Sequence, residues 1–498
     1  MPPVDSIAQK VFEFENTYAE LPAEFYTKQP PRSVKSPRLI KFNDELATEL
    51  GLDPSKLSNA EKASIFGGNR VPASSIPLAM VYAGHQFGGW VPRLGDGRAL
   101  LLGELANRSG KLMDVQLKGS GPTPYSRMGD GRAWVGPVLR EYAVSEAMNA
   151  LGVPTTRALA AVETGEPVYR ETVLPGAILT RVSSSHVRVG TFQYFASRRD
   201  VRSLELLAKH VQTRLYPETR RDANPELALL NLVVAAQARL VADWMGIGFI
   251  HGVMNTDNMS IAGETIDYGP CAFMDGYNSR KVFSSIDVQG RYAYCNQPTI
   301  AAWNLAQFAS SILPLISSNH EESVRLATDA VNCFQNEFND SWTEVLRAKI
   351  GLARQREEDA RLAFEFLALL EGEEVDYTHA FRFLCDAGNQ FREGDMIRDL
   401  FSKKDDIDSW MSKWRARLKF ELVDESRRQS TMKRINPSCI PRNHQIEKAI
   451  KAALSGNYSV FERLVSELAN PFKDRSADDA FFAAPRPNEC VERTFCGT

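Results

Sequence analysis

The stretch from His251 to Asp275 collects the residue types that bind divalent metal ions and move protons. Asp257 and Asn258 are adjacent in it, and Asp267 follows shortly after. Carboxylate and amide oxygens are the ligands that Mg²⁺ prefers, and a carboxylate can also act as a general base. The same residue types are common turn formers, so the catalytic interpretation depends on partners elsewhere in the chain.

The spacing of these residues partly matches the catalytic loop of protein kinases. Kinases carry H-x-D-x-x-x-x-N and then D-F-G, in which the Asn and the second Asp hold metal. His251 and Asn258 have the same offset, and Asp267 opens an Asp-Tyr-Gly triplet. The catalytic Asp position is Val253, which cannot accept a proton, and the nearest carboxylate is Asp257. The sequence therefore predicts a kinase-like metal site with a displaced base.

A lysine and a glutamate upstream complete this set. Lys118 closes the second strand of a hairpin predicted over 99–105 and 111–119, and Glu141 lies 23 residues later on a helix predicted over 134–152. In kinases a strand lysine contacts the nucleotide phosphates and pairs with a glutamate on the next helix. Either residue alone is usually solvated, but their order relative to Asp267 favours a functional pair.

Two Gly-Asp-Gly-Arg turns, at 95–98 and 129–132, precede and follow this hairpin. Free backbone N–H groups in such turns can cradle phosphate, although one such motif is weak evidence. Arg181 and Arg188 flank a Ser-Ser-Ser-His stretch on chain predicted to be extended. Their forked donors could converge on a polyphosphate; the alternative is a pair of solvated arginines on an edge strand.

Composition indicates a globular protein of two to four domains, or a kinase-sized core with a large extension, because the chain has 498 residues with 43% hydrophobic and 24% charged side chains. A net charge of −3 gives no general attraction to nucleic acid or anionic membranes. We expect no membrane span, and the acidic N-terminus is unlike a secretory or transit peptide. We expect a cytoplasmic location, with a mitochondrial one left open.

The seven cysteines are scattered without metal-ligand spacing, so neither a zinc site nor a disulfide framework is expected. Cys496, near the C-terminus, is either a redox-active thiol or an incidental surface cysteine. Further along the chain, strands are predicted around 156–163 and 167–172, and residues 251–275 are predicted to form a loop, a β-hairpin and a second loop. Most of the chain after Asp275 shows helical periodicity.

Taken together, these motifs resemble one family, selenoprotein O (SelO/YdiU), over nearly the whole chain. The resemblance rests on YAGHQFGGWVPRLGDGRA, QLKGSGPTPYSR, HGVMNTDNMSI and TIDYGP, and on a C-terminal Cys. It implies an α+β, protein-kinase-like bilobal fold. The implied divisions are a wrapping segment at 1–75, a small β-rich lobe at 76–200, a helical lobe at 201–390 and a helical extension at 391–498.

The resemblance also implies a role for each candidate residue. Lys118 would contact phosphate with Glu141 as its partner, Asp257 would accept the proton, and Asn258 and Asp267 would hold Mg²⁺ or Mn²⁺. The nucleotide-contacting positions would be Gly95, Gly97, Arg98, Lys118, Asp130, Gly131, Arg181, Arg188 and Asp267.

The implied activity is transfer of AMP from ATP to Ser, Thr or Tyr hydroxyls of protein substrates, with ATP reversed in the cleft. Alternatives left open are a γ-phosphotransferase with a displaced base, a catalytically inactive nucleotide-binding scaffold, and UMP transfer with Mn²⁺. Neither nucleic acid nor a membrane is an expected partner. The family also implies a redox role for Cys496. Some relatives carry a cysteine where this chain has Phe283, so Cys271 and Cys295 are the remaining candidate partners.

Overall fold

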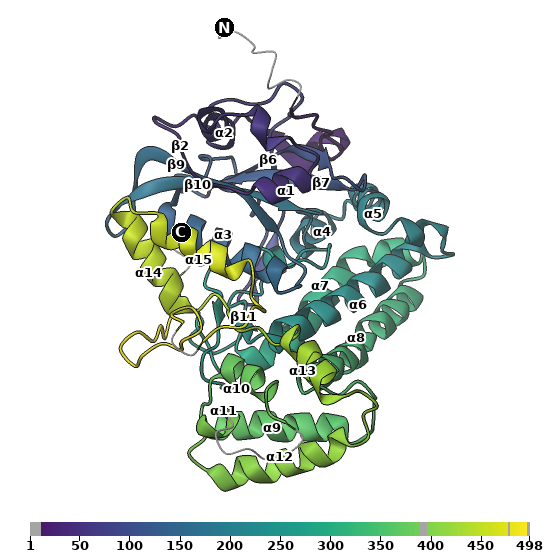
Figure 1. The fold of residues 1–498 in the computed structure, drawn as a ribbon. Helices are drawn as coiled ribbons and strands as arrows, with labels where there is room; N and C mark the ends of the chain where they lie inside the picture. Colours follow the sequence, from purple (N-terminus) through teal and green to yellow (C-terminus); the bar gives the residue numbers. More distant parts are fainter. Residues whose placement is uncertain (1–10, 389–395, 477–478, 496–498) are drawn as a thin grey trace.

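The structure is a computed structural model that describes residues 11–388, 396–476 and 479–495. Among these residues, an antiparallel sheet forms one end of the molecule and helices form the other (Figure 1). The strands run in the order β1-β3-β6-β7-β10-β9-β2, and β8 pairs with β10. Their bounds are β1 Tyr26–Lys28, β2 Arg38–Phe42, β3 Leu78–Met80, β6 Ala99–Ala106, β7 Leu112–Lys118, β8 Ala133–Trp134, β9 Arg157–Tyr169 and β10 Val173–Ser183.

The predicted hairpin that ends at Lys118 is confirmed. β6 and β7 pair antiparallel, with Ala99 opposite Lys118. Burial of nearly every residue of β6 matches its run of Leu side chains, as expected for a strand covered on both faces. β7 in turn pairs with β10, which brings Arg181 opposite Gln116. Because β10 lies between β7 and β9, the backbone that carries Arg181 is hydrogen-bonded on both sides.

Helices cover both faces of the sheet. α3 (Val135–Ala150) packs against β9 and β10, and its C-terminal end is followed by Gly152 at a φ of +83°, as predicted for a helix stop. On the opposite face, α1 (Asp44–Glu49) and α2 (Asn59–Phe66) pack on β9 and bury a second apolar core. α2 begins with a capping box made by Ser58 and Glu61.

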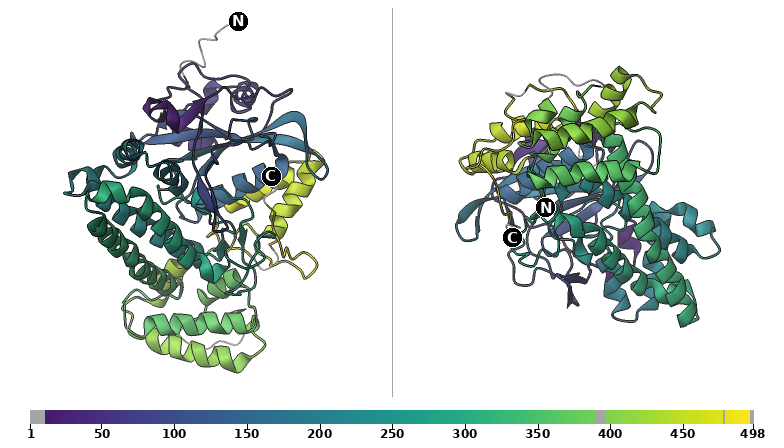
Figure 2. Two further views of the ribbon diagram at one scale, coloured as in Figure 1. Left: turned by 180° about the vertical axis from the view of Figure 1, so that it is seen from behind. Right: turned by 90° about the horizontal axis from the view of Figure 1, so that it is seen from below.

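The rest of the chain is mainly helical, as the periodicity predicts, and Figure 2 shows these helices from two further sides. α6, α7 and α8 pack against one another in the centre of this region. The helices are α4 Val189–Ala196, α5 Val201–Leu215, α6 Pro225–Gly246, α7 Gln297–Ile316, α8 His320–Lys349, α9 Asp359–Gly372, α10 Tyr377–Leu384, α11 Met396–Asp399, α12 Lys404–Leu418, α13 Glu425–Lys433, α14 Asn443–Leu454 and α15 Ser459–Leu468.

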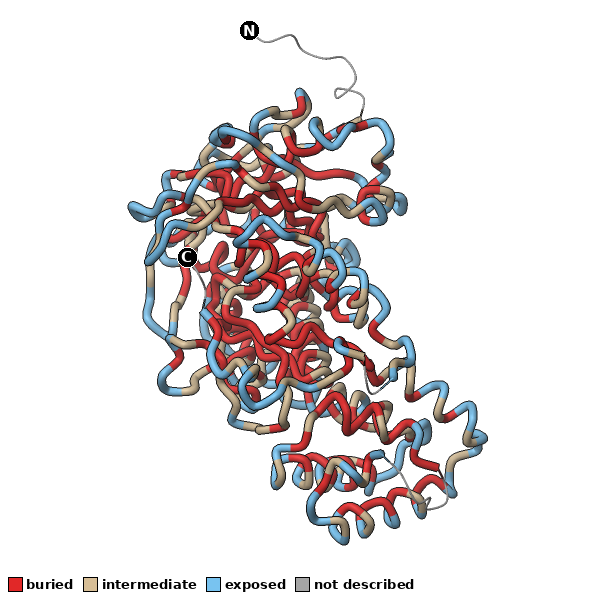
Figure 3. The backbone as a smooth tube through the Cα atoms, turned by 60° about the vertical axis from the view of Figure 1, so that its left-hand side comes forward, coloured by how far each residue is buried: buried red, intermediate tan, exposed pale blue. Residues whose placement is uncertain are grey.

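Two helical segments, Pro225–Gly246 and Tyr294–Ile316, are long and apolar enough to cross a membrane by length and composition alone. About half of each apolar window is buried inside the protein, and the helices pack on each other. Figure 3 shows that buried residues gather in the interior of the molecule, with exposed residues around them. Core helices of this kind pass the same test, so they are weak evidence for a membrane span.

Two predictions of local structure are wrong. Two separate strands are predicted around 156–163 and 167–172, but this described stretch has no break between them. β9 instead runs through Gly165 and Pro167, where a register shift between Pro175 and Ala177 of β10 absorbs the irregularity. Residues 251–275 form no internal hairpin. Ser260 pairs with Arg188 and Thr265 with Thr155, so both bond other segments rather than each other.

Candidate active site

Lys118, Glu141, Arg181 and Arg188 meet at the carboxylate of Asp267. Lys118 Nζ lies 2.7 Å from Glu141 Oε2 and 2.8 Å from Asp267 Oδ1. Arg181 Nη1 lies 2.6 Å from Asp267 Oδ1 and 3.3 Å from Glu141 Oε1, and Arg188 Nη1 donates to Asp267 Oδ2. Segments far apart in sequence therefore place three cations on one acid.

The loop after β11 (Phe249–Ile250) and before β12 (Ala272–Phe273) holds Asp267 in a sparsely populated conformation. Its φ is +62°, in the left-handed region that costs free energy for a residue other than glycine. Burial alone would raise the pKa of Asp267, but the charges of Arg181, Lys118 and Arg188 hold that pKa well below its usual range. Asp267 is therefore ionised, and the ion pairs fix its strained backbone.

The two arginines are buried and sit in the centre of the fold. Each is 2% exposed, so the alternative of solvated edge-strand arginines is wrong. Arg181 Nε donates to Gln116 Oε1 at 2.7 Å. Arg188 Nη1 also donates to the backbone carbonyl of Asp257 at 2.6 Å, and its guanidinium lies over the Tyr82 ring. Buried cations of this kind need anionic partners, which suits them to a polyphosphate.

Asp257 has the environment of a general base. It lies in a 3₁₀ turn, Thr256–Asn258, and is 7% exposed. Burial raises its pKa to about 6, while the hydrogen bond from Gln86 and the charge of Arg188 oppose the rise. Oδ2 accepts from Gln86 Nε2 at 3.1 Å, and Oδ1 has no hydrogen-bond partner among the described residues. At neutral pH the group is mostly ionised and has an oxygen free to accept a proton.

Asn258 lies beside this base, and His251 ties the two halves of the segment together. Asn258 Nδ2 donates to the carbonyl of Val253 at 3.0 Å, which leaves its Oδ1 as the remaining acceptor. His251 Nδ1 accepts from Val253 N, and its Nε2 donates to the carbonyl of Ile266, next to Asp267. The backbone of Val253, which stands at the kinase aspartate position, therefore bonds both Asn258 and His251.

The donor set fits a hard cation. The amide oxygen of Asn258 and the carboxylate of Asp267 are ligands of the type that Mg²⁺ takes. Among the described residues, no group of three or more His, Cys, Asp or Glu could hold a metal ion. An ion bound here would complete its shell with phosphate oxygens and water, as Mg²⁺ usually does.

The two glycine turns have different surroundings. Gly95 (φ +115°) is buried, and a Cβ there would approach the Tyr125 ring to 2.6 Å. At Gly97 a Cβ would meet the carbonyl of Tyr125 at 2.8 Å. Both glycines therefore permit close packing of the turn on the loop at residues 123–126. Arg98, just after them, lines a cavity with Lys118 and Glu141.

The second turn lies at the surface. Asp130 is exposed, and its carboxylate pairs with Arg170 at 2.8 Å. Gly131 has a φ of +64°, and a Cβ there would come within 2.2 Å of the Gly121 backbone. In the described part of the chain, no hydrogen bond or ion pair joins Asp130 to the Asp267 cluster. Its nucleotide contact stays a prediction.

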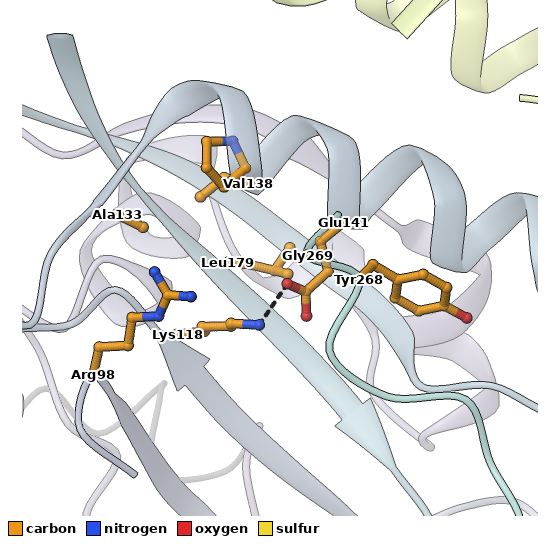
Figure 4. Close-up of a pocket in the computed structure, with 9 residues that line it drawn as sticks. Arg98, Lys118, Ala133, Val138, Glu141, Leu179, Tyr268 and Gly269 are labelled. Carbon is orange, nitrogen blue, oxygen red and sulfur yellow. Dashed lines mark hydrogen bonds and ion pairs between the residues drawn. The ribbon is translucent and has the colours of Figure 1, made fainter. Parts of the chain in front are cut away.

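A cavity opens beside the Lys118–Glu141 pair (Figure 4). Arg98 approaches it from the turn before β6 and Lys118 from the end of β7. Glu141 reaches it from α3, and Tyr268 and Gly269 from the loop after Asp267. The Tyr268 hydroxyl is hydrogen-bonded to Thr155, so its ring is held in the wall. The cavity therefore connects the charge cluster with the Asp-Tyr-Gly triplet.

The C-terminal helices hold α3 from the side opposite the sheet. α14 and α15 both pack on α3 (Figure 1). Arg140 Nη2 pairs with Glu447 of α14, and the Tyr142 ring lies 5.6 Å from the Phe461 ring of α15. Because Arg140 and Tyr142 flank Glu141, these contacts help to fix the carboxylate that pairs with Lys118.

Cys496 lies outside the described residues. The chain just before it pairs with the segment that follows the Asp-Tyr-Gly triplet: Thr494 N donates to the Phe283 carbonyl at 2.7 Å, and Ser285 N donates to the Thr494 carbonyl at 3.0 Å. Cys271 is buried and Cys295 is exposed. The redox role of Cys496 stays a prediction.

Three buried or half-buried cations thus surround one acid in the site. Comparison with known proteins shows which class of protein carries such a site. The family model described as "Protein adenylyltransferase SelO" matches residues 9–469. The chain belongs to this family and is a protein nucleotidyltransferase.

Its relatives match it over almost their full length. A protein of a Bradyrhizobium species named "Protein nucleotidyltransferase YdiU" is 52% identical over 488 residues, covering 98% of this chain and 99% of the relative. A protein of a Jannaschia species with the same name is 53% identical over 487 residues, with the same coverage. These matches confirm the family predicted from the motifs.

Sequence reasoning missed the groups that contact Asp257. Gln86 is the side chain that bonds its carboxylate, and the backbone N–H groups of His85 and Phe87 donate to the side chains of Thr256 and Asn255, which precede Asp257. The Gly- and aromatic-rich stretch around Gln86 was a signal of close packing, but its partner lies 171 residues away. A distance of that kind cannot be inferred from local pattern.

Proposed function

We propose that this protein transfers AMP from ATP to Ser, Thr or Tyr hydroxyls of protein substrates, with ATP reversed relative to a kinase. The observation that carries the proposal is the pair of buried arginines at the carboxylate of Asp267. Arg181 and Arg188 supply a place for the charged γ end of the nucleotide, deep in the fold. The α-phosphate would then face Asp257 at the mouth of the site.

The reaction follows from these placements. The acceptor hydroxyl attacks the α-phosphorus, and its proton passes to Asp257 Oδ1. A new bond forms between the hydroxyl oxygen and the α-phosphorus, and the bond from that phosphorus to the bridging oxygen breaks. Pyrophosphate leaves with the electron pair, and Lys118, Arg181 and Arg188 neutralise its charge. Positioning and charge stabilisation lower the barrier.

Asn258 and Asp267 would hold a divalent ion, Mg²⁺ or Mn²⁺. Such an ion neutralises charge on phosphate oxygens when it is bound. In the structure Asp267 is engaged by Lys118, Arg181 and Arg188. Nucleotide binding would give these cations phosphate oxygens as new partners and free the carboxylate as a ligand.

Neither a γ-phosphotransferase nor an inactive scaffold accounts for the site as well. Val253 leaves the kinase base position apolar, while Asp257 is buried with one free oxygen. A scaffold has no need of a base with this environment. UMP transfer with Mn²⁺ uses the same groups and is a second candidate, since contacts to the triphosphate do not distinguish one nucleobase from another.

The kinase-like bilobal architecture, its four divisions and the cytoplasmic location are part of this proposal. The pairing of Lys118 with Glu141 supports the architecture, because the same pair joins strand and helix in kinases.

Product analysis with the Asp257→Ala variant tests the function. Wild-type protein incubated with Mg²⁺, ATP and an acceptor protein should release pyrophosphate in proportion to modified acceptor. The variant should bind ATP normally and lose nearly all release. Equal rates for the two proteins would contradict the role of Asp257, and orthophosphate as the only product would contradict AMP transfer.

A further inference from the structure

A small hairpin outside the main sheet covers the proposed base. Its strands are β4 (Gly84–Gln86) and β5 (Gly89–Val91), which pair only with each other among the described strands. Three of its consecutive residues bond three consecutive residues of the catalytic segment. His85 N donates to Thr256 Oγ1 at 2.7 Å, Gln86 Nε2 to Asp257 Oδ2, and Phe87 N to Asn255 Oδ1 at 3.0 Å.

The fit between hairpin and base is close. A Cβ built at Gly84 would lie 2.8 Å from Asp257 Oδ1, so the hairpin backbone approaches the carboxylate as only glycine permits. A Cβ at Gly190 would lie 3.4 Å from the Asp257 Cα. Backbone thus packs closely on Asp257, and the Gln86 amide is the side chain that bonds its carboxylate.

The hairpin is anchored independently of this bond. His85 Nδ1 is paired with Gln193 Nε2 of α4 at 2.9 Å, and the His85 ring packs on Trp90 and Trp303. The Phe87 ring lies against Tyr292 at 5.1 Å. Loss of the Gln86 amide alone should therefore leave the hairpin in place.

We propose that Gln86 is a positioning residue for Asp257: its amide donates to Oδ2 and holds the carboxylate in one orientation, which leaves Oδ1, the oxygen without a hydrogen-bond partner, as the proton acceptor. This inference rests on the proposed function. Without that hydrogen bond the carboxylate can rotate about its side-chain torsions, and fewer orientations present an oxygen to the incoming hydroxyl. ATP contacts lie on Lys118 and the arginines, so ATP affinity should not depend on Gln86.

A variant of the same length as Gln separates donation from packing. Gln86→Met keeps the volume but cannot donate. We expect its kcat for AMP transfer to fall about 10- to 100-fold, the range for loss of a hydrogen bond to a charged group. The KM for ATP and the melting temperature should remain close to those of the wild type.

The matched control is Gln193→Ala, which removes the neighbouring anchor on His85 and leaves the Asp257 bond intact. It should keep kcat within about threefold, because it alters no group that bonds the base. An unchanged kcat in Gln86→Met, or an equal loss in Gln193→Ala, would overturn the positioning role while wild-type transfer still stands. Absence of AMP transfer by the wild type would instead refute the proposed function itself.

Discussion

Replacement of Asp267 by Asn should separate its role in stability from its role in catalysis. The carboxylate holds Lys118, Arg181 and Arg188, whose side chains are 12%, 2% and 3% exposed. Asn preserves the shape but removes the charge, so the anionic neighbours left to the cations among the described residues are Glu141 and the more distant Asp96. Removal of one partner of a buried ion pair costs about 3–5 kcal/mol.

We therefore expect Asp267→Asn to lower the free energy of unfolding by about 3 kcal/mol in the absence of nucleotide, since the amide oxygen still accepts one hydrogen bond. With Mg²⁺ and ATP, AMP transfer should fall by roughly 10²–10⁴ because a metal ligand is lost. Denaturant titration and label transfer measure the two effects. The control is Asp329→Asn, which removes an exposed helix pair with Arg325 and should change stability by less than about 0.5 kcal/mol.

The direction in which Asp267→Asn changes the affinity for metal-free ATP is the critical test. In the wild type, Asp267 competes with phosphate for the same three cations. The variant should therefore bind metal-free ATP at least as tightly as the wild type does, although it is less stable. Calorimetry with a chelator present measures this affinity. Much weaker binding of metal-free ATP by Asp267→Asn would refute the reasoning that the carboxylate occupies the place of a phosphate.

Four further tests use Glu141, the arginine pair, Lys349 and Cys496. Glu141→Gln should lower AMP transfer about 10²-fold with ATP still bound, because Lys118 loses one of its two carboxylates; unchanged transfer would contradict the pairing. Alanine at both Arg181 and Arg188 should weaken ATP binding about 10- to 100-fold but leave AMP binding unchanged, as measured by calorimetry, because only ATP has a γ end. Burial lowers the pKa of Lys349 to about 7, so stability should rise with pH between about 7 and 10.5, where the unfolded chain binds more protons than the folded one; denaturant titrations should show no such rise in Lys349→Met. Mass mapping of oxidised protein should find Cys496 in a disulfide if the tail is redox-active, and a free thiol would end that hypothesis.

The sequence predicts the elements that carry local pattern. Glu141 could be placed on a helix and Lys118 at a strand end, because the local apolar pattern marks both elements. Gly152 in addition marks the end of the helix. The pairing of the two residues was predictable from the order of motifs rather than from physics alone. The motifs of protein kinases supplied that order, and the 2.7 Å contact confirms the pair.

The remaining features depend on contacts between distant segments. Nothing local to Asp267 indicates that three cations would share its carboxylate in a left-handed backbone. The docking of Gln86 on Asp257 joins residues 171 positions apart. The predicted hairpin at 251–275 failed for the same reason, because Ser260 and Thr265 satisfy their backbone groups with other segments.

The most direct test of AMP transfer uses ATP labelled at either the α or the γ phosphate, with Mg²⁺, an acceptor protein and mass spectrometry. The site described here predicts that only the α label reaches the acceptor, with a mass gain of AMP on a Ser, Thr or Tyr. Transfer of the γ label alone would show an ordinary kinase with Asp257 as its base. Bound ATP with neither label transferred would contradict a catalytic role for the site.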